Sequence, residues 1–183
     1  MKRSTFSVMA CITLMLGIIA QASCSKDLSP FDVLATAPLA MDRASATARL
    51  EFTLSTEQVK RANKLGLMVA LEFPKTQDFH LEDAIHDTSM PVTVDVAYVE
   101  NGQLISILAK NPQPINDVLS GNENVTALHM HGWDNTTSFV LVTRFRPSQP
   151  GHYIATVKTV RDQPLFAGVP TTVKVAGPYN PGE

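Results

Sequence analysis

Residues 138–157 read SFVLVTRFRPSQPGHYIATV, and this stretch decides the fold class. Its first part, 138–146, is rich in β-branched and aromatic side chains, which is typical of a β-strand. Pro147 and Pro150 then interrupt the run, because proline cannot donate a hydrogen bond to a strand ladder. A second run of the same kind follows at 152–160. The stretch therefore predicts two consecutive strands joined by a short corner.

More strands are predicted elsewhere in the chain. Residues 49–54 alternate between polar and apolar side chains, as a strand with one buried face requires. Residues 92–98 alternate in the same way, and Asn101-Gly102 then predicts a tight hairpin that returns the chain through 104–109. Further strands are expected at 31–36, 66–73, 125–131 and 171–176.

One short helix is predicted between two of these strands. Ser55 and Gln58 form the pattern of a capping box, which begins a helix. Apolar residues then recur at helical spacing before Gly66, at Val59, Ala62 and Leu65. The opposite side is charged, at Glu57, Lys60, Arg61 and Lys64. We therefore expect a helix with one solvated face that joins two strands across an end of the fold.

These elements predict a mainly β protein, a single antiparallel β-sandwich of about eight strands with one short crossover helix. The corner between two of these strands adds a resemblance to a known class of sandwich. Residues 150–153, Pro-Gly-His-Tyr, resemble the tyrosine corner of immunoglobulin-like sandwiches, in which a tyrosine near the start of strand F hydrogen-bonds to backbone just upstream. The resemblance implies that Tyr153 makes this bond and that 171–176 is strand G. Ala155 stands where antibody domains carry a cysteine, so the resemblance is to the wider class.

The first residues are typical of a bacterial export signal. Lys2 and Arg3 precede an uncharged, largely apolar run at 6–22, which is short for a membrane span. The predicted organisation is an export signal at 1–23, a polar tether at 24–30, the β-sandwich domain at 31–177 and a C-terminal tail at 178–183. The expected localisation is the periplasm or the cell envelope.

Two cleavage sites fit this signal. Residues 20–22, Ala-Gln-Ala, fit ordinary signal peptidase, whereas 22–24, Ala-Ser-Cys, resemble the end of a lipoprotein signal in which Cys24 is acylated. Gln21 departs from the aliphatic residue usual in that motif. Cys11 leaves with the signal, so Cys24 would be a lone thiol in an oxidising compartment, which favours lipid attachment and outer-membrane anchoring. Ordinary cleavage stays the alternative.

Charge narrows the class of partner. Removing Lys2 and Arg3 with the signal leaves 13 basic against 17 acidic residues, a net charge of −4. Such a body does not attract a phosphate backbone, so no nucleic-acid partner is expected, and membrane contact is expected only through the lipid anchor. The layout of a signal and one sandwich ending in a Val-Lys-Val strand resembles uncharacterised proteobacterial envelope proteins, a domain-of-unknown-function family. That resemblance supplies no catalytic residues.

Catalytic motifs are missing from the sequence. It has no Gly-x-Ser-x-Gly elbow, no phosphate-binding glycine loop and no His-Glu-x-x-His pair. Cys24 lies beside the cleavage site, where no folded pocket would surround a nucleophile. We therefore predict that the protein is not an enzyme and needs no cofactor.

The histidines suggest an alternative with a metal cofactor. His129 and His131 lie two residues apart in a predicted strand, so both imidazoles are expected on one face, a spacing that suits two ligands of one metal. His86 and Met90, at helical reach of each other in an acidic segment, would complete a copper or zinc site. Alternatively, His129 and His131 lie on the solvent-exposed face of the strand, and the segment around His86 is a solvated loop.

The only tryptophan indicates a candidate partner-binding loop. Trp133, Asp134 and Asn135 lie in a polar segment, and an aromatic side chain at a polar loop is typical of an interface with a protein or a sugar. Trp133 together with Tyr98 would suit a sugar-binding accessory domain. The alternative is that Trp133 folds back and caps the sandwich.

The sequence as a whole favours a non-catalytic periplasmic or outer-membrane-anchored protein. It is expected to bind another envelope or secreted protein through loops and a sheet face. One concrete version is an immunity or inhibitor protein that acts against an exported toxin. Copper or zinc binding and delivery through the His and Met cluster is the alternative.

Overall fold

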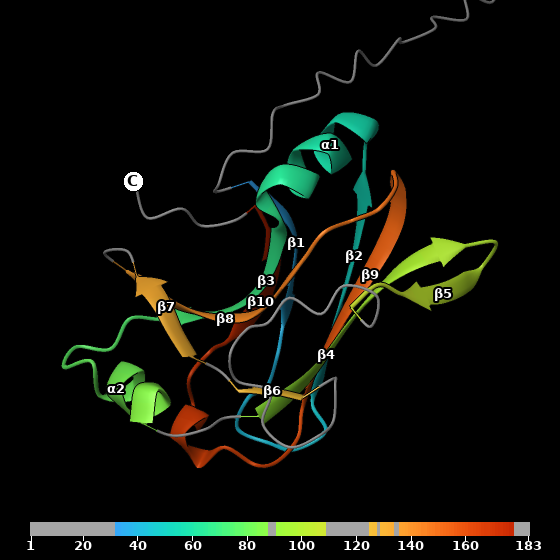
Figure 1. The fold of residues 1–183 in the computed structure, drawn as a ribbon. Coiled ribbons are helices and arrows are strands. Elements are labelled where there is room, and N and C mark those ends of the chain that lie inside the picture. The colour runs from blue at the N-terminus through green and yellow to red at the C-terminus, as the bar shows by residue number, and fades with distance from the viewer. Residues whose placement is uncertain (1–31, 88–90, 109–124, 128, 134–135, 178–183) are drawn as a thin grey trace, which may run out of the picture.

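Two antiparallel β-sheets pack face to face (Figure 1). The computed structural model describes residues 32–87, 91–108, 125–127, 129–133 and 136–177, without the side chains of 86–87, 125–127 and 129–133. The first sheet has the strand order β1-β10-β3-β8-β7, and the second has the order β2-β9-β4-β5 with β6 also paired to β4. The predicted mainly β sandwich is confirmed, and the described residues contain ten strands where about eight were expected.

The elements follow one another as β1 (Val33–Pro38), β2 (Thr47–Leu54), α1 (Thr56–Leu65), β3 (Leu67–Pro74), α2 (His80–Asp87), β4 (Pro91–Glu100), β5 (Gln103–Ser106), β6 (Val125–Ala127), β7 (His129–Trp133), β8 (Thr137–Phe145), β9 (Gly151–Thr159), the 3-10 helix η1 (Pro164–Phe166) and β10 (Thr172–Ala176).

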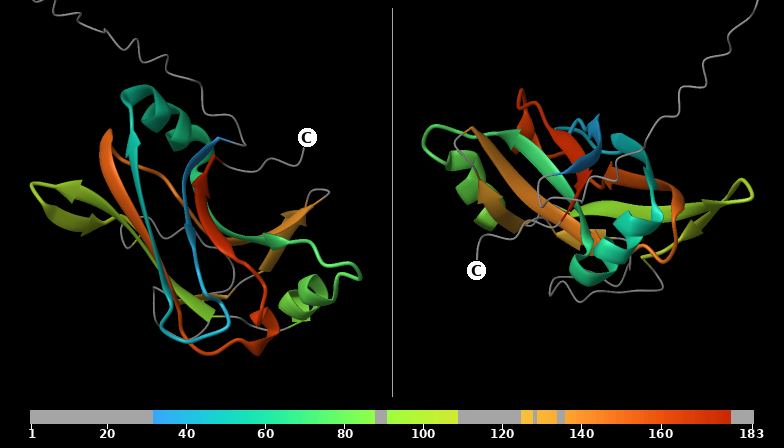
Figure 2. Two further views of the ribbon diagram at one scale, coloured as in Figure 1. Left: turned by 180° about the vertical axis from the view of Figure 1, so that it is seen from behind. Right: turned by 90° about the horizontal axis from the view of Figure 1, so that it is seen from above.

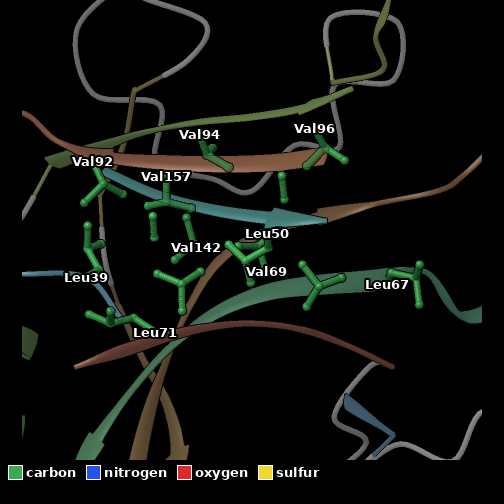
Figure 3. Close-up of a cluster of buried hydrophobic side chains, with 14 of the residues drawn as sticks. Leu39, Leu50, Leu67, Val69, Leu71, Val92, Val94, Val96, Val142 and Val157 are labelled. Atoms are coloured by element: carbon green, nitrogen blue, oxygen red, sulfur yellow. The ribbon is translucent and has the colours of Figure 1, made fainter. Parts of the chain in front are cut away.

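The core lies between the sheets. Strand β2 alternates strictly between exposed and buried residues, as its sequence predicts, and it buries Leu50, Phe52 and Leu54. Figure 3 shows Leu50 on the inner face of the second sheet, opposite Val69 of the first. Burying a side chain of this size stabilises the fold by about 1.5–3 kcal/mol, so the apolar alternation is enough to fix which face of each strand points inward.

The strand registers define two ends of the sandwich. Val33 lies opposite Ala176, and Ala176 lies opposite Met68, which closely follows α1 in the chain. We call this the α1 end. Pro74 lies opposite Thr137 at the other end, where α2 is found, and we call that the α2 end. Figures 1 and 2 show the two helices at these opposite ends.

Helix α1 begins and ends as the sequence predicts. The Ser55 backbone N–H donates to Gln58 Oε1 at 2.8 Å, and the Gln58 N–H donates to Ser55 Oγ, which completes the capping box. The helix joins β2 of the second sheet to β3 of the first, so it crosses one end of the fold as expected. The buried face of the helix is shorter than predicted. Val59 and Ala62 are buried, but Leu65 is 55% exposed.

The hairpin between β4 and β5 is confirmed. Asn101 and Gly102 have φ angles of 51° and 77°, and Glu100 pairs with Gln103 across the turn. Two consecutive left-handed residues are what a tight turn of the primed type requires, and Asn-Gly is the pair that adopts it most readily. The returning strand ends at Ser106, before the predicted limit at 109.

The tyrosine corner is also confirmed. The Tyr153 hydroxyl donates to the Gln149 carbonyl at 2.5 Å, and the ring is fully buried. Burial raises the pKa of this hydroxyl, so it stays a donor. The expectation that 171–176 is strand G is wrong, because β10 lies in the first sheet while β9 lies in the second, between β2 and β4. In antibody domains strands F and G share a sheet.

We expect Tyr153→Phe to lower the free energy of unfolding by about 1 kcal/mol, because it removes the bond to Gln149 and leaves a partly buried carbonyl without its donor. The ring would keep its stacked partner Phe52, whose centroid lies 5.6 Å away. Urea denaturation measures the change. An unaltered midpoint would show that the corner bond does not stabilise the fold.

One predicted strand proves to be two. Residues 125–131 were expected to form a single strand, but β6 pairs with β4 in the second sheet, and β7 pairs with β8 in the first. The chain therefore passes from one sheet to the other between Ala127 and His129. This crossing places β7 at the edge of the first sheet, beside α2.

Candidate functional site

Helix α2 lies against β7 and beside η1 at the α2 end of the sandwich (Figures 1 and 2). We define the α2–β7 corner as the loop 75–79, α2, β7 and the first residues of β8, Thr137 and Ser138. It contains four of the residues that the sequence singles out, His86, His129, His131 and Trp133. It also contains residues that the sequence did not indicate.

The acidic segment around His86 forms a helix, so the solvated loop considered for it and the expectation of a single helix are both wrong. Leu81 and Ile85 lie four residues apart on one face, and both are buried. The Asp83 N–H donates to the Phe79 carbonyl at 2.8 Å at the start of the helix. Two acidic residues in the first turn also favour a helix here, since its N-terminus carries partial positive charge.

Glu82 holds the corner together. Its side chain is nearly fully buried, with the residue only 4% exposed. Oε1 accepts hydrogen bonds from the Ser138 hydroxyl at 2.7 Å and from the Thr76 backbone N–H at 3.1 Å, and Oε2 accepts one from the Thr76 hydroxyl. One carboxylate therefore connects α2, the loop before it and β8.

These hydrogen bonds control the charge of Glu82. Burial by itself raises the pKa of the carboxyl, because a charged group loses hydration. The bonds from Ser138 and Thr76 favour the charged form and outweigh that effect, so the pKa of Glu82 lies below its usual value of 4.5. Glu82 is thus an ionised buried carboxylate at neutral pH.

We expect this lowered pKa to make stability depend on pH. The charged form is favoured in the folded state, so its contribution is complete above pH 4.5 and is lost as the pH falls through the lower folded pKa. Urea denaturation at a series of pH values would compare wild type with Glu82→Gln, which cannot titrate. The difference in stability should be constant near neutral pH and should narrow in acid. A difference that does not change with pH would contradict this account.

Phe79 presents an aromatic ring beside α2. Its residue is 38% exposed, and Lys75 Nζ lies 4.8 Å from the ring centroid, a cation-π geometry. The φ angle of Phe79 is 54°, which is uncommon for a bulky residue. The loop is held by the Lys75 N–H, which donates to the Thr136 carbonyl at 2.9 Å. Backbone in sparsely populated regions is concentrated at ligand-binding and switch sites.

The fold brings together two of the segments proposed to bind metal. His86 lies in α2, His129 and His131 lie in β7, and the two elements are in contact. The regular alternation assumed for β7 does not hold, because a bulge between Met130 and Gly132 makes His131 the extra residue. A common face for the two imidazoles therefore no longer follows from their spacing.

Other proposed site residues fall partly outside the described chain. Trp133 lies opposite Ser138, the residue that bonds to Glu82, so its backbone belongs to the corner. Met90, Asp134, Asn135 and Cys24 lie outside the described residues.

Trp133 and Tyr98 do not form a joint site. Tyr98 lies opposite Tyr153 in the second sheet, towards the α1 end, whereas Trp133 lies in the first sheet at the α2 end. The Tyr98 ring packs edge-on against Tyr153 at 5.2 Å. The sugar-binding arrangement that used both rings is therefore wrong.

Glu82, Lys75 and Phe79 were missed by sequence reasoning. The spacing of Leu81 and Ile85 could have indicated Glu82. Two apolar residues four apart predict a helix with a buried face, and Glu82 directly follows the first of them. Nothing in the sequence indicates that Lys75 and Phe79 would meet. Their contact depends on the turn that leads into α2.

A metal-binding cluster of side chains and a membrane-spanning helix are both absent from the part of the chain that is described. No three His, Cys, Asp or Glu side chains there come close enough together to hold a metal ion. None of the helices there has the length and apolar character needed to span a membrane.

Comparison with known proteins supports the fold alone. The sequence matches no protein family, and no curated protein is similar to it at a significant level. A crystal structure of a protein from Sulfurospirillum deleyianum is similar in fold, with a TM-score of 0.51 and 8% identity. The match covers 79% of this chain and 97% of that one. At this identity the likeness shows a similar fold and carries no function to this chain.

Proposed function

We propose that this is a non-catalytic binding protein of the bacterial cell envelope that recognises another protein through the α2–β7 corner. The observation that carries the proposal is the exposed Phe79 ring, fixed beside Lys75 on a loop that the buried Glu82 ties to the sandwich. Aromatic side chains held rigidly at a surface are typical anchors of protein interfaces.

The position of the corner supports this proposal. The described chain begins at the α1 end, and the corner lies at the opposite end. Strand β3 runs the whole way between them, a distance of about 26 Å for its length. A protein attached to a membrane through Cys24 would therefore hold the corner away from that membrane.

A pull-down from envelope extract tests the proposal. Wild-type protein should retain a specific partner, identified by mass spectrometry, and Phe79→Ala with Lys75→Ala should lose it. Leu104→Ala is the matched control, because Leu104 is 55% exposed but lies on the β4–β5 hairpin. Retention of the partner by the corner variant, at equal stability, would place the interface elsewhere. Recovery of an exported toxin that is inhibited on binding would support the immunity version.

Lipid attachment at Cys24 is tested separately. Mass spectrometry of the protein isolated from membranes should find an acylated N-terminal Cys24, and Cys24→Ala should abolish membrane association. A mature chain that begins at Ser23 would instead support secretion after ordinary cleavage.

Copper or zinc binding is the second candidate function. The contact between α2, which carries His86, and β7, which carries His129 and His131, favours it. Calorimetric titration with each metal should show binding that His129→Ala with His131→Ala removes and that His152→Ala, on the distant strand β9, leaves intact. Absence of binding below millimolar metal would remove this candidate.

A further inference from the structure

The α1 end of the sandwich combines basic and apolar side chains at the point where the described chain begins. Lys60 and Lys64 are exposed on α1, and Lys60 Nζ pairs with Glu57 Oε1 at 2.8 Å. Arg61 is half-buried on the same helix, so α1 carries three basic residues against a single acidic one. Leu65 at the end of the helix is 55% exposed. The helix therefore presents a small, positively charged face with an apolar residue at its edge.

The first strand starts at the same end. Val33, the first residue of β1, lies opposite Ala176, which in turn lies opposite Met68, just after α1. Val33 is 52% exposed, so Val33 and Leu65 are both exposed apolar side chains at the α1 end. Figure 1 and the left view of Figure 2 show α1 and the start of β1 at this end.

We propose that α1 rests on the phospholipid headgroups of the membrane that holds acylated Cys24. This inference rests on the lipid attachment in the proposed function. Residues 24–31 could span at most about 28 Å when fully extended. The chain enters the sandwich at Val33, so the α1 end would be the part of the domain nearest the membrane. The occupant of the α1 face is therefore a surface of anionic phospholipid.

The charges of α1 could orient a domain that is already tethered to the membrane, but they would not by themselves draw the domain to it. The mature chain carries a net charge of −4, so the domain as a whole is not drawn to anionic lipid. Once tethered, however, α1 meets the headgroups at millimolar effective concentration. Each basic residue near an anionic surface then favours contact by about fivefold, and Leu65 can enter the interface.

Lysine footprinting tests this orientation on the full mature chain. The protein would be placed on vesicles of phosphatidylcholine with or without phosphatidylglycerol and treated with an acetylating reagent, and each lysine would be read by mass spectrometry. We expect Lys60 and Lys64 to react about fivefold more slowly when phosphatidylglycerol is present. Lys158, exposed on β9 towards the α2 end, should react at one rate on both vesicles.

Two variants provide a matched comparison. Arg61→Gln should reduce the protection of Lys60 and Lys64, and high salt should remove it. Arg161→Gln makes the same change of charge at the α2 end, after β9, and should leave the protection unaltered. If Lys60 and Lys64, like Lys158, each react at the same rate with and without phosphatidylglycerol, the inference is overturned.

Failure of lipid attachment can be separated from failure of this inference. If Cys24 is not acylated in the natural protein, the chain starting at residue 24 can be coupled through Cys24, its only cysteine, to a maleimide lipid. Protection of Lys60 and Lys64 in the coupled protein would support the orientation even then. Protection in cell envelopes but not on vesicles would identify a protein as the occupant of α1 and would overturn the inference.

Discussion

Glu82→Ala should lower the free energy of unfolding by about 3 kcal/mol, because it removes a buried carboxylate from three donors at once. The buried Ser138 hydroxyl and both donors of the half-buried Thr76 would lose their shared acceptor. The variant should lower the stability of the whole domain and should also loosen α2 locally, since Glu82 connects α2 to β8. Urea denaturation measures the first effect, and hydrogen exchange of the α2 amides measures the second.

Two further variants show whether the carboxylate is responsible. Asp83→Ala changes the neighbouring residue, which is exposed, and should alter stability by less than about 0.5 kcal/mol. Glu82→Gln keeps one acceptor oxygen and the shape of the side chain, so its cost should lie between the other two. If Glu82→Ala costs no more than Asp83→Ala, the hydrogen bonds do not hold the corner.

Gly151→Ala should also cost about 3 kcal/mol, for two reasons that add. Gly151 has a φ of 139°, which favours glycine, and a Cβ there would lie 2.7 Å from Tyr98 Cε2 and 2.9 Å from its hydroxyl. The Tyr98 ring has little room to retreat, because it packs against Tyr153 at the tyrosine corner. Thermal and urea denaturation would measure the loss.

Gly168→Ala separates the backbone effect from the steric one. Gly168 has a φ of 74° but no atom within 4 Å of its Cβ position, so only backbone strain of about 1 kcal/mol is expected. Gly151→Ala should also cost less when it is added to Tyr98→Ala than when it is made in the wild type, because the clashing ring is then absent. Equal costs at Gly151 and Gly168 would show that Tyr98 moves aside freely.

The sandwich could be predicted because local sequence and tertiary packing agree in it. Tyr153 with Pro150 and Gly151 specifies the corner, and Asn101-Gly102 specifies the hairpin, each through the conformation of a few adjacent residues. The assignment of β10 to a sheet could not be predicted in this way. An apolar run such as 171–176 can pair in either sheet, and only the contacts of β1 and β3 decide which.

The candidate site was harder to predict because it is made of side chains that meet only after folding. Residues 125–131 look like one strand, and no turn residue marks the passage between sheets that places β7 beside α2. Glu82 looks like a surface residue in an acidic segment, and its burial depends on Ser138, far away in the chain. The spacing of His129 and His131 predicts a shared face only in a regular strand, and the bulge in β7 removes that regular alternation.

The opposite placement of Val33 and the α2–β7 corner determines how the domain would carry a mechanical load. A pull between an anchored N-terminus and a partner at the corner would act along the strands. Strand β1 would then have to slide past β10. All the hydrogen bonds between these two strands would be strained at the same time, instead of breaking one after another. Loaded in this way, the ladder between β1 and β10 would resist a pull between the two ends of the sandwich.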